Sequence, residues 1–457
     1  NGVPQNHFEP SANQTIVEEQ FLKGSCPYLF GWDGSKFEFM TDVLWPSALG
    51  MPLGIMAGET LYAFPNSTDE YLMVPGKLQP KDGHYLMNFT TELWETPYLD
   101  KVHLLAIDHP DSVEVLIDEK FSPPPFPSSR IYNFTKKYLP IYAEDHRGND
   151  VLEVIENHDK RYLSNFLMDK YQGVSELHDL ILGFDNLDVN DSLFLFLQGW
   201  LFPTDASINV NISQSKTTNS IFPYIEVVGE DGDWIVAEEN IGFPKGKNKT
   251  MVINMTNKFL SEDYRIRIRT TMQIYWDHIF ITSNASGNIF KNYKLNPVSA
   301  DLSYRGFSEI NRVDFSSPHI PDYYNVNKGQ KWRDLIGNYT RYGDVLPLLL
   351  ESDNKYVIMN AGDEIKLKFD ASSLPEIKKG WKRDFLFYND GWLKDGDLNT
   401  AEGQTVDPLP FHGMNSYPYE NKSDFPMDQF YKNYQKNYNS RVVTTDQFKN
   451  YLREQNK

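Results

Sequence analysis

The sequence has a single cysteine, Cys26, among 457 residues, so no disulfide can form within the chain. A chain of this length does not need one, because it carries enough apolar material for a hydrophobic core. It also has no apolar run of the 18 residues that a transmembrane helix requires. The longest run, SLFLFLQGWLF at 192–202, is interrupted by Gln198 and Gly199 and predicts a buried strand. We therefore expect no membrane span in this chain.

Recognisable catalytic motifs are missing as well. The sequence contains no G-x-S-x-G, H-E-x-x-H, P-loop, G-x-G-x-x-G or C-x-x-C pattern, and its ten histidines are scattered. No catalytic or cofactor-binding residue can therefore be assigned, and the sequence favours a non-enzymatic protein. The paired carboxylates of a glycosidase meet in space and not in sequence, so a polysaccharide-acting hydrolase stays open as an alternative.

The charge balance excludes one class of partner. The formal net charge is −19 and the isoelectric point about 5.0. Such a charge repels phosphate backbones, so we expect no nucleic-acid partner. The acidic residues are spread in twos and threes and form no tail, which is typical of a solvated acidic surface.

Aromatic residues are abundant, with 27 Tyr, 29 Phe and 9 Trp. Aromatic side chains are enriched in β-strands, where they pack on the pleated surface. They also suit surfaces that stack on sugars, because each ring offers an apolar face. The composition favours a β-rich globular protein and leaves room for a glycan-binding face.

Short strand-like runs alternate with turn signals along most of the chain. YLFGWDGSKFEFMTDV predicts a hairpin about Asp33-Gly34, and YIEVVGEDGDWIVAEENIGFP predicts another about 229–232. YLDKVHLLAIDHPDSVEVLID predicts a third hairpin, with its turn at 109–112. The run DYRIRIRTTMQIYWDHIFIT predicts two long strands, with arginines 265, 267 and 269 on one face. We expect these arginines to pair with carboxylates.

These patterns predict a mainly β fold of two or three antiparallel β-sandwich or jelly-roll-like units with a short helical insert. The insert is expected where apolar residues recur at helical spacing, between about 149 and 183. The expected divisions are an N-terminal arm at 1–25, a β-rich domain at 26–148, a helical insert at 149–185, a jelly-roll-like domain at 186–300, a β-rich domain at 301–425 and a polar, partly helical tail at 426–457. Within the tail, Thr444 or Thr445 is the expected cap of a helix.

Acceptor sequons for N-glycosylation are more frequent than chance predicts. An excess of sequons favours a secreted or cell-surface glycoprotein, and an asparagine-rich genome is the alternative explanation. The acceptor residues are Asn13, Asn66, Asn88, Asn133, Asn190, Asn211, Asn248, Asn254, Asn284, Asn338 and Asn421.

The stretch RDFLFYNDGWLKDGDLNTAEG, at 383–403, holds the strongest candidate for a metal site. Asp395, Asp397 and Asn399 alternate as the first ligands of a calcium loop do, and Asp407 or Glu402 could close the loop. The EF-hand pattern fails, because Thr400 stands where its glycine should be. The alternative is a turn stabilised by hydrogen bonds, and Asp390-Gly391 is expected to form a hairpin turn. Calcium is the one cofactor that the sequence predicts.

Several segments resemble, in order, one region of a known group of exported proteins. The segments are CPYLFGWDGSKFEFMTDVL (26–44), YWDHIFI (275–281), RYGDVLPLL (341–349), WKRDFLFYNDGWLKDGDLNT (381–400) and PLPFHGMNSYPY (408–419). The resemblance is to the C-terminal part of proteins that carry FG-GAP, ASPIC/UnbV or tetratricopeptide modules, the first two of which also occur in relatives of cartilage acidic protein. It implies an exported β-rich protein with binding or assembly roles, and it supplies no catalytic residues. The β-propeller and ASPIC/UnbV modules themselves are not visible in this chain.

The sequence thus favours a non-catalytic extracellular or cell-surface binding or assembly protein. Its expected partners are glycans and other surface or extracellular proteins, and its expected location is secreted or at the cell surface. Two alternatives remain: a secreted hydrolase that acts on polysaccharide, and a structural subunit of a larger surface complex. In the second alternative Cys26 or the tail would make the contacts.

Overall fold

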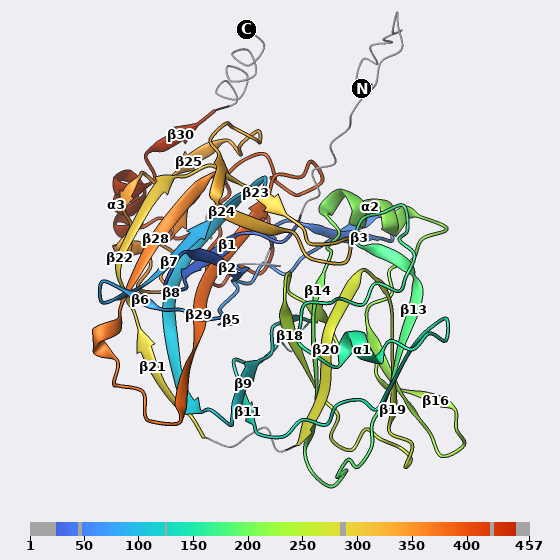
Figure 1. Cartoon of the computed structure of the whole chain (residues 1–457). Helices are drawn as coiled ribbons and strands as arrows, with labels where there is room; N and C mark the ends of the chain where they lie inside the picture. Colours follow the sequence, from blue (N-terminus) through green and yellow to red (C-terminus); the bar gives the residue numbers. More distant parts are fainter. Residues whose placement is uncertain (1–23, 44–47, 124–125, 284–288, 421–424, 445–457) are drawn as a thin grey trace, which may run out of the picture.

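The structure is a computed structural model that describes residues 24–43, 48–123, 126–283, 289–420 and 425–444. These residues form several antiparallel sheets and few helices, which confirms the predicted mainly β fold. Figure 1 shows two bodies side by side, one mostly blue and orange and the other green and yellow. Each body is a β-sandwich, because two sheets share one hydrophobic core.

The first sandwich takes strands from both ends of the chain. Its core combines Met87 and Phe89 of one sheet with Leu104 and Phe387 of the other. The first sheet has the order β2 (Phe37–Asp42), β1 (Tyr28–Trp32), β7 (His84–Thr90), β28 (Asp363–Asp370), β22 (Pro297–Tyr304) and β26 (Gly343–Asp344), with β6 (Pro80–Lys81) paired to β7. The second has the order β21 (Lys291–Leu295), β8 (Glu95–Pro110), β29 (Trp381–Asp395) and β5 (Glu70–Val74), with β27 (Val357–Ile358) paired to β8.

In the sequence, the strands of the second sandwich lie between the N-terminal and the C-terminal strands of the first sandwich. Leu193, Leu195 and Leu197 enter its core, since alternate residues of a strand face the same side. One sheet has the order β12 (Tyr142–Asp145), β13 (Val174–Gly183), β19 (Arg265–Met272), β15 (Tyr224–Val228) and β16 (Trp234–Glu238). The other has the order β18 (Lys249–Asn254), β14 (Leu193–Leu201) and β20 (Ile274–Ser283).

Smaller elements complete the described part of the chain. The paired strands are β3 (Pro52–Met56) with β4 (Glu59–Tyr62), β9 (Glu114–Ile117) with β11 (Ile131–Phe134), β10 (Lys120–Phe121) with β17 (Phe243–Pro244), β23 (Phe307–Asn311) with β24 (Ile320–Asn327), and β25 (Gly337–Tyr339) with β30 (Arg441–Val443). The helical elements are α1 (Leu152–Ile155), α2 (Ala206–Gln214), α3 (Gln429–Tyr438) and the 3₁₀ turns η1 (Leu346–Leu348) and η2 (Ala371–Ser373). None of these helices is long and apolar enough to cross a membrane, within the residues described.

Two predicted hairpins are confirmed and one is wrong. Strands β1 and β2 pair, as do β15 and β16. The chain does turn after Pro110, but β8 and β9 do not pair with each other. Both edges of β8 are already occupied by β29 and β21, so β9 pairs with β11 instead. The long-range pairing of β8 with β29 joins the units predicted at 26–148 and 301–425 into one sandwich.

The helical insert predicted at 149–185 differs from the structure. Every residue of this range is described, and α1 is its one helix; strand β13 occupies most of its last third. Leu180 and Leu182 of β13 both enter the core, so a period of two decides the structure there. Helix α3 lies within the predicted tail, 426–457. The predicted arm (1–25) lies mostly outside the described residues, as does the helix predicted to start at Thr444 or Thr445.

The arginine ladder of β19 pairs with carboxylates, as expected. Arg267 Nε lies 2.6 Å from Glu226 Oε2, and Arg269 Nε lies 2.8 Å from Asp179 Oδ1. Arg265 Nη2 lies 2.6 Å from Oδ2 of Asp263, which lies just before β19. This face therefore presents neutralised pairs rather than a free basic surface.

A row of lysines joins the two sandwiches. Lysines 245, 247 and 249 alternate along the segment that leads into β18, and each pairs with a carboxylate outside the second sandwich. Lys249 is almost completely buried. Ion pairs at this depth need good geometry, since each charge loses its hydration. The pairs are Lys245–Glu70, Lys247–Asp42 and Lys249–Glu119.

Candidate functional site

Two buried aspartates, Asp100 and Asp390, lie where the register between strands β8 and β29 shifts by one residue. The register shifts between Asp390 and Gly391, which leaves Asp100 as an extra residue in β8 and forms a β-bulge. A side chain at Gly391 would place its Cβ 2.2 Å from the carbonyl oxygen of Tyr98, so the close approach requires glycine. Strand β29 continues through the bulge, and the predicted hairpin turn at Asp390-Gly391 is therefore wrong.

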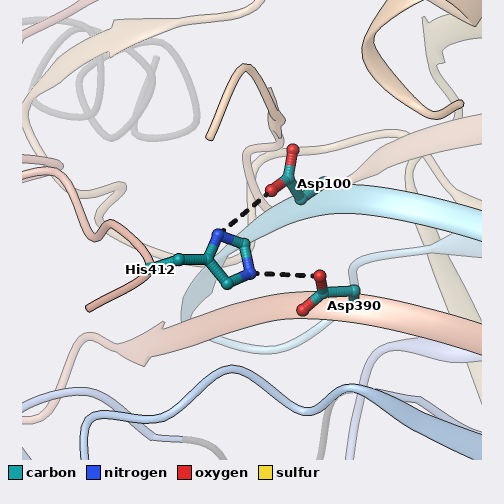
Figure 2. A group of neighbouring side chains, drawn as sticks. All are labelled: Asp100, Asp390 and His412. Atoms are coloured by element: carbon teal, nitrogen blue, oxygen red, sulfur yellow. Dashed lines mark hydrogen bonds and ion pairs between the residues drawn. The ribbon is translucent and has the colours of Figure 1, made fainter. Parts of the chain in front are cut away.

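His412, on the segment after β29, bridges the two aspartates (Figure 2). Its Nε2 lies 3.1 Å from Asp390 Oδ2, and its Nδ1 lies 3.6 Å from Asp100 Oδ2. Nδ1 also lies 2.7 Å from Asn354 Oδ1, which accepts the backbone N–H of His412 as well. Trp392 packs edge-on against the imidazole, with ring centroids 4.6 Å apart.

Burial and charge shift the titration of all three groups. Burial raises the pKa of Asp100 to about 7, against the lowering effect of an N–H from Asn354 and the charge of His412. Burial lowers the pKa of His412, but the hydrogen bond and charge of Asp390, with the charge of Asp100, outweigh it and raise the pKa. Burial also raises the pKa of Asp390, and its hydrogen bonds outweigh this and lower it. The cluster therefore favours a protonated imidazolium.

Asp100, Asp390 and His412 form the one group, among the described residues, whose donor atoms are close enough to hold a metal ion. Both ring nitrogens of His412 face oxygen acceptors, however, so each is suited to carry a proton rather than to offer a lone pair. For the same reason, neither nitrogen is free to act as a base on a substrate. The arrangement best suits an ion bridge that holds the His412 segment against β8 and β29.

His412 also lines a cavity of about 620 Å³, which we call the His412 cavity. Its walls come from 63–71, 117–118, 120–122, 126–129, Lys245, Trp392 and 411–415. Phe64 and Phe126 are 46% and 45% exposed, and their rings meet edge to face at 6.1 Å. Two half-exposed rings in one cavity provide an apolar surface for a ligand.

Glu70, which lines the cavity, has an unused hydrogen-bond acceptor. Glu70 pairs with Lys245 through Oε2, while its Oε1 is buried without a hydrogen-bond partner among the described residues. Leaving a buried acceptor unsatisfied costs about 1–3 kcal/mol. A ligand that brings a hydroxyl or amide donor would remove this cost.

The predicted calcium loop is organised by hydrogen bonds of its own. Asp395 Oδ1 accepts from the side chain of Thr400 and from the backbone N–H of Asp397, at 3.1 Å for the latter. Asp397 accepts from the Asn399 N–H at 2.8 Å and from the Ser207 hydroxyl at 2.7 Å. These carboxylates therefore hold a turn and tie it to α2.

The fourth predicted ligand, Asp407, contacts a cation that the chain itself supplies. Lys394 Nζ lies 2.9 to 3.1 Å from the carbonyl oxygens of Thr405, Val406 and Asp407. Burial lowers the pKa of this lysine to about 7. The Lys394 amino group thus already occupies these carbonyl oxygens, which a bound cation would need as ligands.

Calcium is therefore expected to leave the melting temperature of the protein unchanged. Because a ligand that binds only the native state raises the melting temperature, the comparison of 1 mM calcium with excess chelator is decisive. A melting temperature that calcium raises in the wild type but not in Asp397→Ala would instead support the predicted calcium site.

The predicted glycosylation sites divide by exposure. Asn66, Asn190, Asn211, Asn254 and Asn338 are exposed, and Asn248 is half-buried. Asn88 and Asn133 are each 3% exposed, and Asn88 donates to the Tyr323 hydroxyl at 2.6 Å. A glycan on either of these two would not fit this fold. Asn13, Asn284 and Asn421 lie outside the described residues.

Sequence reasoning missed the residues that form the ion bridge. Asp100 and Asp390 each lie near the middle of a long strand, and a charge there is a signal of a bulge or a paired buried charge. Nothing local connects either of them with His412. Cys26, a predicted contact of the structural-subunit alternative, is fully buried, so it cannot form a contact with a partner in this fold.

Comparisons of the chain with family models, curated proteins and solved structures find no match. The resemblance to the FG-GAP and ASPIC/UnbV-associated proteins therefore stays a prediction.

Proposed function

We propose that this chain is a non-catalytic, secreted or cell-surface protein that binds carbohydrate in the His412 cavity. The observation that carries the proposal is the combination, in one cavity, of the exposed Phe64–Phe126 pair with the unsatisfied Glu70 Oε1. Sugars present an apolar ring face beside hydroxyl donors, so one ligand could use both features.

The ion bridge of His412 supports binding rather than catalysis. Because both imidazole nitrogens already face acceptors, the ring serves to fix one wall of the cavity. Lys245 and Lys120 also line the cavity and provide donors for sugar oxygens. The set of groups is that of a preformed binding site.

The test is a glycan array on the whole chain, followed by calorimetry with the strongest ligand. Phe64→Ala and Phe126→Ala are each expected to weaken binding by about tenfold, since one aromatic contact contributes ~0.5–1.5 kcal/mol beyond its buried area. Phe430→Ala is the control, because Phe430 is 64% exposed on α3 and lies outside the cavity.

Asn66 lines the cavity and belongs to a sequon, so the binding measurements use Asn66→Gln throughout. This change removes competition from a glycan attached to the chain. The proposal is wrong if no glycan binds, or if the two phenylalanine variants bind as tightly as the control.

A further inference from the structure

The outer face of the sheet β18-β14-β20 carries a polar row among aromatic rings. On β14, Phe194, Phe196 and Trp200 belong to aromatic clusters on this face, and Gln198 lies between them. Gln198 pairs in register with Thr250 of β18, and its Nε2 donates to the Thr250 hydroxyl at 3.1 Å. This is the position at which the longest apolar run of the sequence is interrupted.

A second β-bulge places Asp277 on the same face. The register between β14 and β20 shifts at Gln198 and Gly199, which leaves Asp277 as the extra residue. Trp276 and Ile279 enter the core on either side of the bulge, so Asp277 and His278 both face outward. A Cβ at Gly199 would lie 2.4 Å from the Tyr275 carbonyl oxygen, so this approach also requires glycine.

Asp277 and Gln198 both line a cavity of about 1110 Å³ between the two sandwiches, which we call the Asp277 cleft. Its other walls include Phe39, Tyr162 and Tyr324. Ten acidic side chains line it, against six of lysine or arginine. A cleft with an excess of one sign of charge concentrates ligands of the opposite sign.

The two buried side chains retain unused capacity to accept hydrogen bonds. Gln198 is 7% exposed, and its Oε1 has no hydrogen-bond partner within the described part of the chain. Asp277 is 2% exposed; its Oδ1 accepts the N–H of Lys160 at 2.9 Å, and its Oδ2 lies 3.4 Å from His158 Nε2. Burial raises the pKa of Asp277 to about 6, so a cation beside it would stabilise its charged form.

We infer that the Asp277 cleft is a second ligand site, which binds a small organic cation through an ammonium group placed between Asp277 and the Gln198 amide oxygen. An ammonium group offers three donors and a full positive charge, and the site offers two buried acceptors and an acidic lining. A neutral sugar would use the acceptors but gain nothing from the charge. The ligand class therefore differs from that of the His412 cavity.

The test is calorimetry of the whole chain with putrescine, and with 1,4-butanediol as the neutral molecule of the same length. Putrescine is expected to bind and the diol is not. Asp277→Asn is expected to weaken putrescine binding by at least tenfold. Asp231→Asn, which makes the same charge change on an exposed turn, is expected to leave it unchanged.

Gln198→Met provides a second variant in case Asp277→Asn fails to fold, and it is also expected to weaken binding. The inference is overturned if putrescine does not bind, if the diol binds equally well, or if the folded Asp277 and Gln198 variants bind as the Asp231 control does. Glycan binding in the His412 cavity is measured separately, so either proposal can fail without the other.

Discussion

Lys249→Met is expected to lower the free energy of unfolding by about 3–5 kcal/mol, which is the cost of removing one partner from a buried ion pair. Lys249 Nζ lies 3.5 Å from Glu119 Oε1, and the side chains are 0% and 3% exposed. Methionine preserves most of the length of the lysine side chain but leaves the Glu119 carboxylate buried without its cation. Burial already raises the pKa of Glu119, so its charged form is costly there.

Urea or thermal unfolding of the variant measures this loss. The matched control is the double variant Lys249→Met with Glu119→Gln, which removes both charges and retains an acceptor for the N–H of Met73. We expect it to recover most of the lost stability. An equal loss in the single and double variants would mean that the charge pair contributes nothing and that packing alone is responsible.

His412→Gln is expected to cost about 2–3 kcal/mol below pH 6.5, less than the ~3–5 of a fully buried pair because the imidazole is 34% exposed. The loss arises because the Asp390 carboxylate, whose pKa lies below its ordinary value, would keep its charge within the sandwich without the imidazolium beside it. Chemical unfolding of the two proteins at several pH values measures the difference.

The difference between wild type and His412→Gln is expected to shrink as the pH rises. The folded state raises the pKa of His412 above its ordinary value, so the folded state binds the proton more tightly than the unfolded state. The resulting stability is fully present below about pH 6.5, the ordinary value for histidine, and is lost as the pH rises through the folded pKa. A difference that stays constant from pH 6 to pH 9 would contradict the ion bridge.

The parts of the fold that could be predicted are those with local signals. Short strand-like runs between turn signals identified many of the strands, and the tight turn at Asp33-Gly34 identified the β1–β2 hairpin. The pairing of β8 with β29 joins residues about 280 positions apart. No local pattern encodes such pairing, which is why one sandwich appeared in the sequence as two separate units.

The candidate sites were hidden for a related physical reason. Asp100 and Asp277 are each the extra residue of a β-bulge, so their direction depends on the register of two strands and not on their own sequence. The sequence did mark Gln198 and Gly199 as an interruption of an apolar run. The sequence could not show that Gly199 permits the close approach of β20, or that Asp277 lies on β20 opposite the Gln198-Gly199 pair.

The loop predicted to bind calcium shows that a local pattern can indicate two different structures. The alternation of Asp395, Asp397 and Asn399 is local and visible, and it is shared by metal loops and by turns in which carboxylates accept backbone N–H groups. The hydrogen bonds of the structure are those of such a turn. Spacing alone could not separate the two, because both require oxygens at alternate positions.

The most direct test of the proposed function is a crystal structure of the Asn66→Gln chain soaked with the glycan that binds it most tightly. The account predicts a sugar ring against Phe64 and Phe126, with one hydroxyl donating to Glu70 Oε1. A glycan bound elsewhere on the molecule, or an empty His412 cavity at saturating glycan, would contradict it.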